Sequence, residues 1–524
     1  MKLKFVSVEE GISAIGFRKI ISVAKKLNPD LEIYFVTTGN LYSLRKHIFP
    51  TTSEHFDAKD FSNIAKEIAD ADLLCFSAMT PSAPYVERLI KLVRKINPKI
   101  YVLWGGAHSI IYPDEAIEHA DAICTGEGEI PFVKFYKAFC EGGNYLKTPT
   151  MWFKKGKRTY RNLNLPLNTP KQIDSFPYLY NGFDCNIYDL KLKRFRPLTQ
   201  SDCLNFNGLS YKTIWTLGCP FSCIYCANDA FIKYDQKYRI VRYPSIDHIL
   251  SEIESAIKIN PFISTIIFED DNFITIPTSV IRNFAKEYKK RIGLPFVVPG
   301  IHPNFITKEK IDILGKAGMN RSRMGIQSAS KKMLLFYRRP TPLPIVKKSA
   351  NTLVNTSRKY NMIPPAFDII IDNPIETKED LVETLRFLYD LERPYTLTVF
   401  SLRVFPKTKL WDYFQSHPVA DIRQLTSSYL DTRKTMASIL LYLLPVVKLP
   451  RFIHDYLLTK VEGYKNNTRY YPRLYWIAKT LYLISRAKDH LMRLDFSTIV
   501  GPWGYILWKV GIIKKSKVAL SVIS

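Results

Sequence analysis

The stretch TLGCPFSCIYCAND, residues 216–229, gathers three of the eight cysteines of this chain into eight positions. Cys219, Cys223 and Cys226 follow an apolar run, residues 213–218, that has the pattern of a strand. We therefore expect the three thiols to lie in a loop at the carboxyl end of a parallel strand, where barrels carry their reactive groups. Reduced thiols with this spacing are typical of metal ligands rather than of a disulfide framework.

Thiolates suit iron-sulfur clusters, and three of them would leave one iron of a four-iron cube open to a small molecule. Structural zinc needs four ligands, and no second cysteine pair or suitably spaced histidine lies nearby, since His248 falls in a helical pattern. Three unligated thiols remain the alternative without a metal. No ligand spacing is seen for the other cysteines, which are Cys75, Cys124, Cys140, Cys185 and Cys203.

Residues 1–143 alternate short apolar runs with amphipathic segments, which predicts a five-stranded, doubly wound parallel sheet. The runs are residues 3–8, 32–38, 73–79, 100–106 and 122–128. Ligands of such sheets bind beyond the carboxyl ends of the strands. The small or polar residues expected at those ends are Ser77, Thr80, Gly105, Gly106, His108, Gly126, Glu127 and Gly128. No G-x-G-x-x-G follows the first strand, which disfavours a nicotinamide or flavin dinucleotide.

The rest of the chain divides into three further segments. Residues 144–205 predict an irregular connector with a hairpin near 151–162. Residues 206–410 alternate six apolar runs with helical patterns, which predicts a partial (β/α)6 barrel. Those runs are residues 213–218, 264–270, 296–301, 323–328, 367–372 and 396–402. Residues 411–524 become helical, aromatic and basic, so the predicted fold class is α/β with a helical carboxyl-terminal region.

The formal charge of +27 over 524 residues favours anionic partners without choosing among nucleic acid, anionic lipid and phosphorylated substrates. Residues 472–494 place Lys479, Arg486 and Arg493 seven positions apart on one stripe of a helix, with apolar residues on the other side. This helix either lies on an anionic membrane or packs on the protein with a solvated basic face.

Two patterns bear on where the protein resides. The first residues, MKLKFVSVEEG, have the pattern of a strand rather than of a secretory signal, and no apolar run reaches the roughly 20 residues that span a bilayer. We therefore expect a cytoplasmic protein, with peripheral association at a membrane surface as the alternative.

The C-x3-C-x2-C spacing with Tyr225 before the last cysteine resembles the signature of the radical S-adenosylmethionine (radical SAM) superfamily. The resemblance implies that S-adenosylmethionine binds the open iron of a 4Fe-4S cluster and is cleaved to a 5′-deoxyadenosyl radical. It also implies an electron donor such as flavodoxin or ferredoxin.

Other strand ends resemble further motifs of the superfamily. Phe268–Asn272 stands where the family often has a glycine-glycine-glutamate motif, and Gly325–Ser330 resembles the ribose-contacting motif with glutamine in place of glutamate. The fifth strand of the barrel resembles the segment against which adenine packs. The S-adenosylmethionine contacts that these matches imply are Tyr225, Glu269, Asp270, Asp271, Gln327, Ser328 and Asp372.

The amino-terminal sheet followed by this barrel resembles the cobalamin-binding (class B) radical SAM methyltransferases. None of the nine histidines lies in a D-x-H-x-x-G motif, so cobalamin would be held without that ligand, and His108 is the histidine best placed to approach it. The resemblance implies methyl transfer to an unactivated carbon of a small-molecule or lipid-like substrate. The alternatives are a cobalamin-dependent cyclase or rearrangement enzyme, a methylthiotransferase acting on transfer RNA, and a non-catalytic cobalamin sensor. Scattered cysteines in the first domain and a helical carboxyl end disfavour the transfer RNA enzyme, and with it nucleic acid as a partner.

Overall fold

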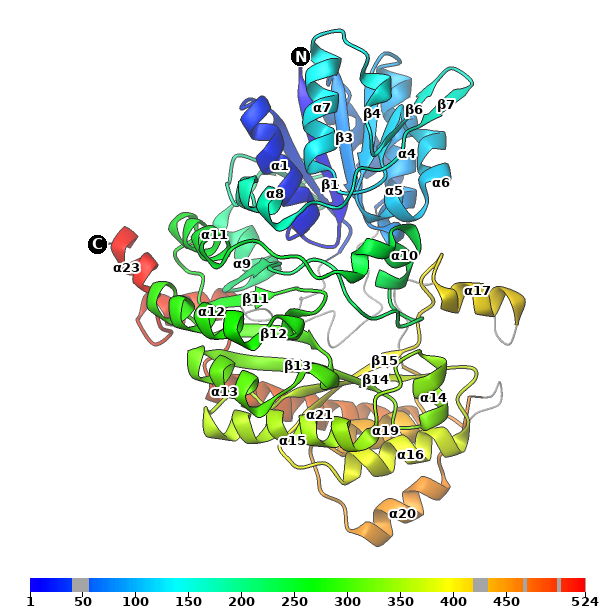
Figure 1. Ribbon diagram of the computed structural model, residues 1–524, viewed down its shortest axis with the longest axis vertical. Helices are drawn as coiled ribbons and strands as arrows, with labels where there is room; N and C mark the ends of the chain where they lie inside the picture. The colour runs from blue at the N-terminus through cyan, green and yellow to red at the C-terminus, as the bar shows by residue number, and fades with distance from the viewer. Residues whose placement is uncertain (40–55, 418–431, 465–468, 497–500, 524) are drawn as a thin grey trace. The chain divides into compact units, whose positions relative to one another are not determined.

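The computed structural model describes residues 1–39, 56–417, 432–464, 469–496 and 501–523 (Figure 1). The chain forms two compact units. The first contains Met1–Lys212, Asp247–Phe262 and Ser497–Ile512, and the second contains Thr213–Ile246, Ile263–Phe496 and Ile513–Ser524. Within the predicted helical region, residues 418–431, 465–468 and 497–500 lie outside the described residues.

The first unit is built on a nine-stranded sheet with the order β7-β6-β5-β4-β3-β1-β2-β8-β9. Parallel pairing places Val6 of β1 opposite Tyr34 of β2 on one side and Phe76 of β3 on the other. The five predicted strands are present, namely β1 (Leu3–Glu9), β2 (Glu32–Thr37), β3 (Leu73–Ala78), β4 (Tyr101–Gly105) and β5 (Ala122–Cys124). Since the chain leaves β1 toward β2 and continues on the other side with β3, the strand order reverses beside β1.

Helices cover both faces of this sheet, as a doubly wound fold requires. One core joins Phe5 and Phe35 to α1 and α7 through Phe17, Phe132 and Phe135, and the opposite core joins the other strand face to α3, α4 and α6. The helices of this unit are α1 (Ile15–Leu27), α3 (Ala58–Ile68), α4 (Ala83–Ile96), α5 (Ala107–Ile111), α6 (Pro113–His119), α7 (Glu129–Cys140), α8 (Pro170–Ser175), α9 (Gln200–Asn207), α11 (Ile246–Ile259) and α22 (Gly501–Lys509).

The segment expected to be an irregular connector is more ordered than its sequence pattern indicates. The hairpin predicted near 151–162 is present as β6 (Met151–Lys155) and β7 (Arg158–Arg161), and β6 pairs antiparallel with β5. A second hairpin, β8 (Asn186–Asp189) and β9 (Arg194–Pro197), extends the other edge by parallel pairing with β2. These hairpins cover both edges of the parallel sheet, which would otherwise expose unpaired backbone groups.

The second unit carries the six-stranded sheet of the predicted barrel, in the sequential order β10-β11-β12-β13-β14-β15. Its strands are β10 (Ser210–Thr213), β11 (Thr265–Phe268), β12 (Phe296–Ile301), β13 (Met319–Gln327), β14 (Ala366–Ile371) and β15 (Thr396–Ser401). The helices between and after them are α10 (Asn228–Tyr234), α12 (Thr278–Arg291), α13 (Lys308–Ala317), α14 (Lys331–Phe336), α15 (Leu343–Lys359), α16 (Lys378–Tyr389) and α17 (Lys409–Ser416). From β11 to β15 each strand runs parallel to the last, and such an open sheet is the partial barrel that the sequence predicts.

The first barrel strand differs from its prediction. The strand expected at 213–218 ends at Thr213, because the backbone N–H groups of Trp215 and Thr216 donate to the side chain of Asp270 instead of to a neighbouring strand. The first cysteine therefore lies six residues beyond the strand end, on a loop that has its own hydrogen bonds.

The carboxyl-terminal region is helical, as predicted, and consists in the second unit of α19 (Met436–Leu443), α20 (Arg451–Thr459), α21 (Pro472–Met492) and α23 (Lys517–Ile523). The hydroxyl of Tyr482 on α21 both donates to the backbone carbonyl of Leu397 on β15 and accepts from its N–H. The edge strand of the open barrel thus finds hydrogen-bond partners in this helix. Among the described residues, no helix is both long and apolar enough to cross a bilayer.

Helix α21 packs on the barrel, as one of the two interpretations of its sequence expects, but through a different side from the aliphatic one. Its buried residues are Tyr475, Ala478 and Tyr482. Two of the three basic residues of the stripe lie against these tyrosines, with Lys479 Nζ 5.6 Å from the Tyr475 ring centre and the Arg486 guanidinium 5.8 Å from the Tyr482 ring centre. Tyrosine combines an apolar ring with a hydroxyl that can bond the edge of β15, so it takes the packed side that we expected aliphatic residues to fill.

Candidate active site

The cysteine loop is fixed by backbone hydrogen bonds on both sides. Leu217 and Arg242 exchange two N–H···O bonds of 2.8 and 2.9 Å, and the N–H of Cys219 donates to the carbonyl of Tyr238 at 3.0 Å. Between them Gly218 has a φ of +97°, and a Cβ there would lie 2.6 Å from the Tyr238 carbonyl oxygen. The backbone therefore requires glycine directly before the first cysteine.

Two adjacent carboxylates at the end of β11 hold the same loop. Asp270 accepts from the N–H of Thr216 at 2.6 Å, from its hydroxyl at 2.7 Å and from the N–H of Trp215 at 3.2 Å. Asp271 accepts from the N–H of Gly218 and from two side chains, Asn228 and Tyr238. Both carboxylates, predicted as S-adenosylmethionine contacts, thus position the cysteine loop in this structure. Burial raises the pKa of Asp270 to about 7.

The three cysteines carry free thiols in a largely buried environment. Burial raises the pKa of the Cys219 thiol to about 11 and that of Cys226 to about 12, so bound metal is needed to favour the thiolates. The side chain of Asn272 and the backbone at Phe221 and Asn228 hydrogen-bond to these sulfurs and partly oppose the rise. Such donors suit an anionic cluster.

The described residues contain no group of three His, Cys, Asp or Glu side chains that could hold a single metal ion. In a four-iron cube each cysteine binds a different iron, so its three thiolates need not converge on one point. The donor set therefore fits a cluster better than it fits one zinc ion.

Arg339 is the main site residue that our reading of the sequence missed. Its Nη1 lies 3.7 Å from Cys223 Sγ and 3.5 Å from Tyr225 Oη, and its Nη2 donates to the carbonyl of Gly325 at 2.8 Å. A Cβ on Gly325 would lie 3.1 Å from Arg339 Nη2, so this glycine makes room for the guanidinium. A permanent cation beside a cysteine ligand stabilises negative charge on the cluster or on a bound carboxylate. The one signal for it in the sequence is the pair of consecutive arginines, Arg338 and Arg339.

The structure separates the two residues predicted to contact the ribose. Gln327 has a φ of +70°, and its amide nitrogen lies close above Gly325, which brings it near Arg339. Ser328 is fully buried, and its hydroxyl lies 3.1 Å from that of Thr384 on α16. Gln327 therefore lies with the cysteine-loop residues, whereas the Ser328 hydroxyl is engaged with a helix.

Two other predicted contacts directly follow strands β11 and β14, which are separated in the sheet by β12 and β13. Glu269 is exposed and follows β11 directly, so its carboxylate is accessible, unlike that of Asp270. Asp372 follows β14 with a φ of +59° and accepts from the N–H of Arg433 at 2.9 Å. Tyr225 lies with its ring centre 5.1 Å from that of Tyr337 in an edge-on contact. These individual ligand assignments stay predictions.

Glu376, four residues beyond Asp372, is a buried carboxyl whose two oxygens find no hydrogen-bond partner among the described residues. Burial, followed by the negative charges of Asp380 and Asp372, raises its pKa well above the usual value, and Lys332 opposes this only weakly. Folding therefore retains the proton on this side chain while the unfolded chain releases it near pH 4.5, so its contribution to stability declines as the pH rises above that value.

We expect Glu376→Gln to raise the melting temperature, with a gain that is larger at pH 8 than at pH 5. Each pH unit in that window adds about 1.4 kcal/mol to the cost of keeping the native carboxyl protonated, until its raised pKa is reached. Calorimetric unfolding at the two pH values measures this, with Glu383→Gln on the exposed side of α16 as the matched control. A gain independent of pH would contradict the argument.

In the first unit, the predicted cobalamin residues of β3 and β4 lie at the strand ends beside the reversal in strand order. Ser77 and Thr80 are partly exposed, and a Cβ on Gly105 would meet nothing closer than 3.9 Å. Gly106 differs, because a Cβ there would lie 2.8 Å from the Ala78 carbonyl oxygen. Its positive φ of +94° brings the turn against β3, whereas Gly105 leaves room for a flat ligand.

The predicted residues after β5 mostly contact the chain itself. A Cβ on Gly126 would lie 2.8 Å from Thr150, and Glu127 accepts from the N–H of Asn168 at 2.6 Å. A Cβ on Gly128 would make only ordinary contacts, the nearest at 3.5 Å from the Cys124 sulfur. These residues lie at the correct end of the sheet, but the chain itself occupies the space beside Gly126.

His108 is 1% exposed and stacks between Trp104 and Tyr112, with ring centres 4.9 and 5.4 Å away. Burial lowers its pKa to about 4, so the ring is neutral, and within the part of the chain that the structure describes neither nitrogen has a hydrogen-bond partner. Because the ring is enclosed between Trp104 and Tyr112, His108 is a packing residue in this structure. Its role as a cobalamin contact stays a prediction.

Glu9, the last residue of β1, lies at the reversal in strand order and was also missed. Its carboxylate accepts a hydrogen bond from the Met79 backbone, and burial raises its pKa to about 8. The adjacent Met79 side chain is 53% exposed. The signal available in the sequence was an acidic residue directly after the apolar run of residues 3–8.

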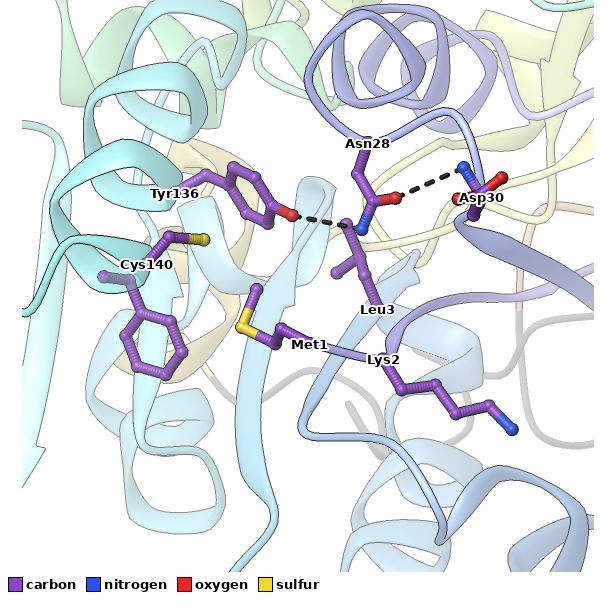
Figure 2. A pocket seen from close by; sticks show the side chains of 8 residues that line it. Met1, Lys2, Leu3, Asn28, Asp30, Tyr136 and Cys140 are labelled. Atoms are coloured by element: carbon purple, nitrogen blue, oxygen red, sulfur yellow. Dashed lines mark hydrogen bonds between the residues drawn. The ribbon is translucent and has the colours of Figure 1, made fainter.

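The first unit also has a hollow of about 660 Å³ at the opposite end of its sheet (Figure 2). It is lined by Met1–Leu3, Asn28, Asp30, Tyr136, Phe139 and Cys140. Figure 2 shows Tyr136 and Asp30 bonded to the Asn28 side chain. Because it lies at the amino end of β1, it is remote from the strand ends at which such sheets bind ligands.

Comparison with protein families agrees with this geometry. Residues 213–388 match the radical SAM superfamily, and residues 44–135 match the B12 binding domain. The first match contains the cysteine loop, Asp270 and Arg339, and the second contains the ends of β3, β4 and β5.

Similar proteins include an uncharacterized methyltransferase of Pyrococcus horikoshii, PH0819, which is 23% identical over 408 residues, 74% of this chain and 82% of the relative. An anaerobic magnesium-protoporphyrin IX monomethyl ester cyclase of Cereibacter sphaeroides is 24% identical over 72% of this chain and 60% of its own length.

Two solved structures show the same fold at low sequence identity. The radical S-adenosylmethionine methyltransferase TsrM from Kitasatospora setae, with tryptophan and a SAM analogue, has a TM-score of 0.61 and 14% identity, covering 79% of this chain and 76% of TsrM. The cobalamin-dependent radical enzyme OxsB with aqua-cobalamin has a TM-score of 0.59 and 13% identity, covering 100% of this chain and 83% of OxsB.

The chain has a doubly wound domain, followed by a partial barrel that carries a three-cysteine loop held by hydrogen bonds. Radical SAM enzymes that bind cobalamin combine these features. This chain combines a B12 binding domain with a radical SAM domain, and it is a radical SAM enzyme. The two domains imply S-adenosylmethionine, a 4Fe-4S cluster and cobalamin as its cofactors. The predicted class, fold and cofactors are thereby confirmed.

Proposed function

We propose that this enzyme transfers a methyl group to an unactivated carbon of a small-molecule or lipid-like substrate, in a cobalamin-dependent radical reaction. The observation that carries the proposal is the loop of Cys219, Cys223 and Cys226, held by Asp270 and flanked by Arg339, in a chain that also has a B12 binding domain. When bound, the cluster would supply the electron that cleaves S-adenosylmethionine, and cobalamin would carry the methyl group.

The side chains of the second unit would divide the work of binding. The three thiolates hold the cluster, and Arg339 supplies a cation beside Cys223 that suits the carboxylate of S-adenosylmethionine. The exposed carboxylate of Glu269 suits its ammonium group. A reduced flavodoxin or ferredoxin would deliver the electron.

Methyl transfer is supported by two similar proteins, the methyltransferase PH0819 and the tryptophan-bound methyltransferase TsrM. Ring closure is the second candidate, because two anaerobic magnesium-protoporphyrin IX monomethyl ester cyclases match over 72% and 61% of this chain. Both reactions would use the same cysteine loop, and they differ in whether the product gains a methyl group.

The test uses the full chain, reconstituted anaerobically with iron, sulfide and methylcobalamin and then reduced. Incubated with cell extract and S-adenosylmethionine labelled in its methyl hydrogens, the enzyme should release deoxyadenosine and S-adenosylhomocysteine and yield a product carrying the labelled methyl group. A sample in which Cys219, Cys223 and Cys226 are all alanine is the control, and mass spectrometry is the readout.

Three results would speak against methyl transfer. Deoxyadenosine with a product that lacks the label would support ring closure or rearrangement. Cobalamin binding without deoxyadenosine would support a sensor. A methylthio group on transfer RNA would support the methylthiotransferase.

A further inference from the structure

Helix α21 exposes an apolar stripe instead of burying it. With about 3.6 residues per turn, its packed side contains Tyr475, Ala478 and Tyr482, so the opposite side faces away from the protein. On that side Ile477 is 57% exposed and Ile484 is 61% exposed. The exposed stripe as a whole consists of Leu474, Ile477, Leu481, Ile484, Leu491 and Met492.

An apolar stripe of this length needs a partner. Solvent-exposed aliphatic side chains over five turns of one helix are far more than the scattered apolar residues of an ordinary surface. The packed side of α21 is fully engaged, since Tyr482 bonds β15 and the Tyr475 hydroxyl lies 2.8 Å from that of Thr432. The helix is thus fixed to the barrel by one side and presents the other.

The charges on and around the stripe are positive. Arg473 and Lys488 are exposed among its apolar residues. The only acidic side chain of the helix, Asp489, lies on the other side, where it pairs with Arg493 at 3.2 Å. From residue 441 to 524 the chain has 14 lysines and arginines against 4 aspartates and glutamates.

This charge pattern selects among apolar partners. A second copy of the chain docking through the same stripe would bring Arg473 and Lys488 against equivalent cations, which is unfavourable. A bilayer with anionic headgroups would accept the aliphatic side chains between its headgroups and attract both cations. Trp476, 37% exposed at the margin of the stripe, is the type of residue that prefers this boundary.

We infer that α21 is a peripheral membrane anchor that lays its stripe of Leu474, Ile477, Leu481, Ile484, Leu491 and Met492 into the surface of an anionic bilayer. The basic residues Lys479 and Arg486 contact the tyrosines of the packed side. The contact with the bilayer is therefore made by the aliphatic stripe and by the two cations within it, Arg473 and Lys488. The inference stands independently of the reaction proposed above, because it uses no residue of the cysteine loop.

The test is co-sedimentation of the full-length protein with vesicles. We expect binding to vesicles of equal parts phosphatidylcholine and phosphatidylserine, and at least about tenfold weaker binding to phosphatidylcholine alone. The double variant Ile477→Glu with Ile484→Glu should weaken binding to the anionic vesicles at least about tenfold. The control pair, Leu335→Glu with Ile345→Glu, changes residues of similar exposure on α14 and α15 and should bind as the wild type does.

Circular dichroism and reconstituted iron content, unchanged in both double variants, establish that the fold is retained. A second pair, Arg473→Gln with Lys488→Gln, should reduce the preference for anionic over neutral vesicles. The inference is overturned if the wild type does not bind anionic vesicles, or if Ile477→Glu with Ile484→Glu leaves binding unchanged. A wild-type dimer in solution that this variant converts to a monomer, without any vesicle binding, would assign the stripe to self-association instead.

Discussion

Cys223→Ala is expected to leave the anaerobically reconstituted protein without its iron-sulfur absorbance and without deoxyadenosine formation. Three thiolates are the fewest that hold a four-iron cube while one iron stays open to S-adenosylmethionine, so two cannot replace them. Cys223 also receives the Arg339 guanidinium at 3.7 Å, and its loss leaves that cation without its sulfur partner. Iron and sulfide analysis, the absorbance spectrum and chromatography of deoxyadenosine measure the effect.

The same outcome is expected for Cys219→Ala and Cys226→Ala. The matched control is Cys140→Ala, which changes an exposed thiol at the end of α7 and should retain wild-type iron and turnover. If a single alanine at any of the three loop positions kept both the cluster and the cleavage of S-adenosylmethionine, the assignment of the ligands would be wrong.

Asp270→Asn is expected to have the next largest effect, although Asp270 need not touch a cofactor. Its carboxylate accepts three hydrogen bonds from Trp215 and Thr216, the residues that lead into the cysteine loop. An asparagine offers one acceptor oxygen and sets its NH₂ group against at least one backbone N–H. A buried donor without a partner costs about 1–3 kcal/mol. If this cost destabilises the loop conformation that holds the cysteines, retention of the cluster weakens by about 5- to 150-fold.

The measurement is the rate of iron loss to a chelator, followed by the rate of deoxyadenosine formation in freshly reconstituted samples. Asp312→Asn, which removes an exposed ion pair with Lys359, is the control. If Asp270 acted solely by binding S-adenosylmethionine, Asp270→Asn would retain iron as the wild type does and raise only the concentration of S-adenosylmethionine needed for turnover. That pattern would contradict the positioning role.

Local patterns in the sequence were enough to predict the architecture and to single out the candidate cluster ligands. Alternation of apolar runs with amphipathic segments predicts parallel strands and helices because each element buries one face, and five strands of the first sheet and five of the six barrel strands were found where their runs predict. Cys219, Cys223 and Cys226 could be read together because a cluster-binding loop is one short, contiguous stretch.

The supports of the site could not be read in the same way. Asp270 bonds a residue 54 positions away and Arg339 reaches one 116 positions away, and no periodicity encodes such pairs. Ser328, which the motif marks as a ligand contact, instead meets Thr384, 56 positions away.

Helix α21 shows the same division between what local sequence patterns predict and what tertiary contacts decide. Its sequence fixes that one side is apolar and another basic, because a helix repeats every 3.6 residues or so. Which side packs is a competition between surfaces, and the edge of β15 favours Tyr482 because unpaired backbone groups need hydrogen bonds that leucine and isoleucine cannot make. The sequence by itself thus determined the elements and the candidate thiol ligands, while the tertiary structure decided which side chains hold the cysteine loop and which stripe faces outward, because both depend on contacts between distant parts of the chain.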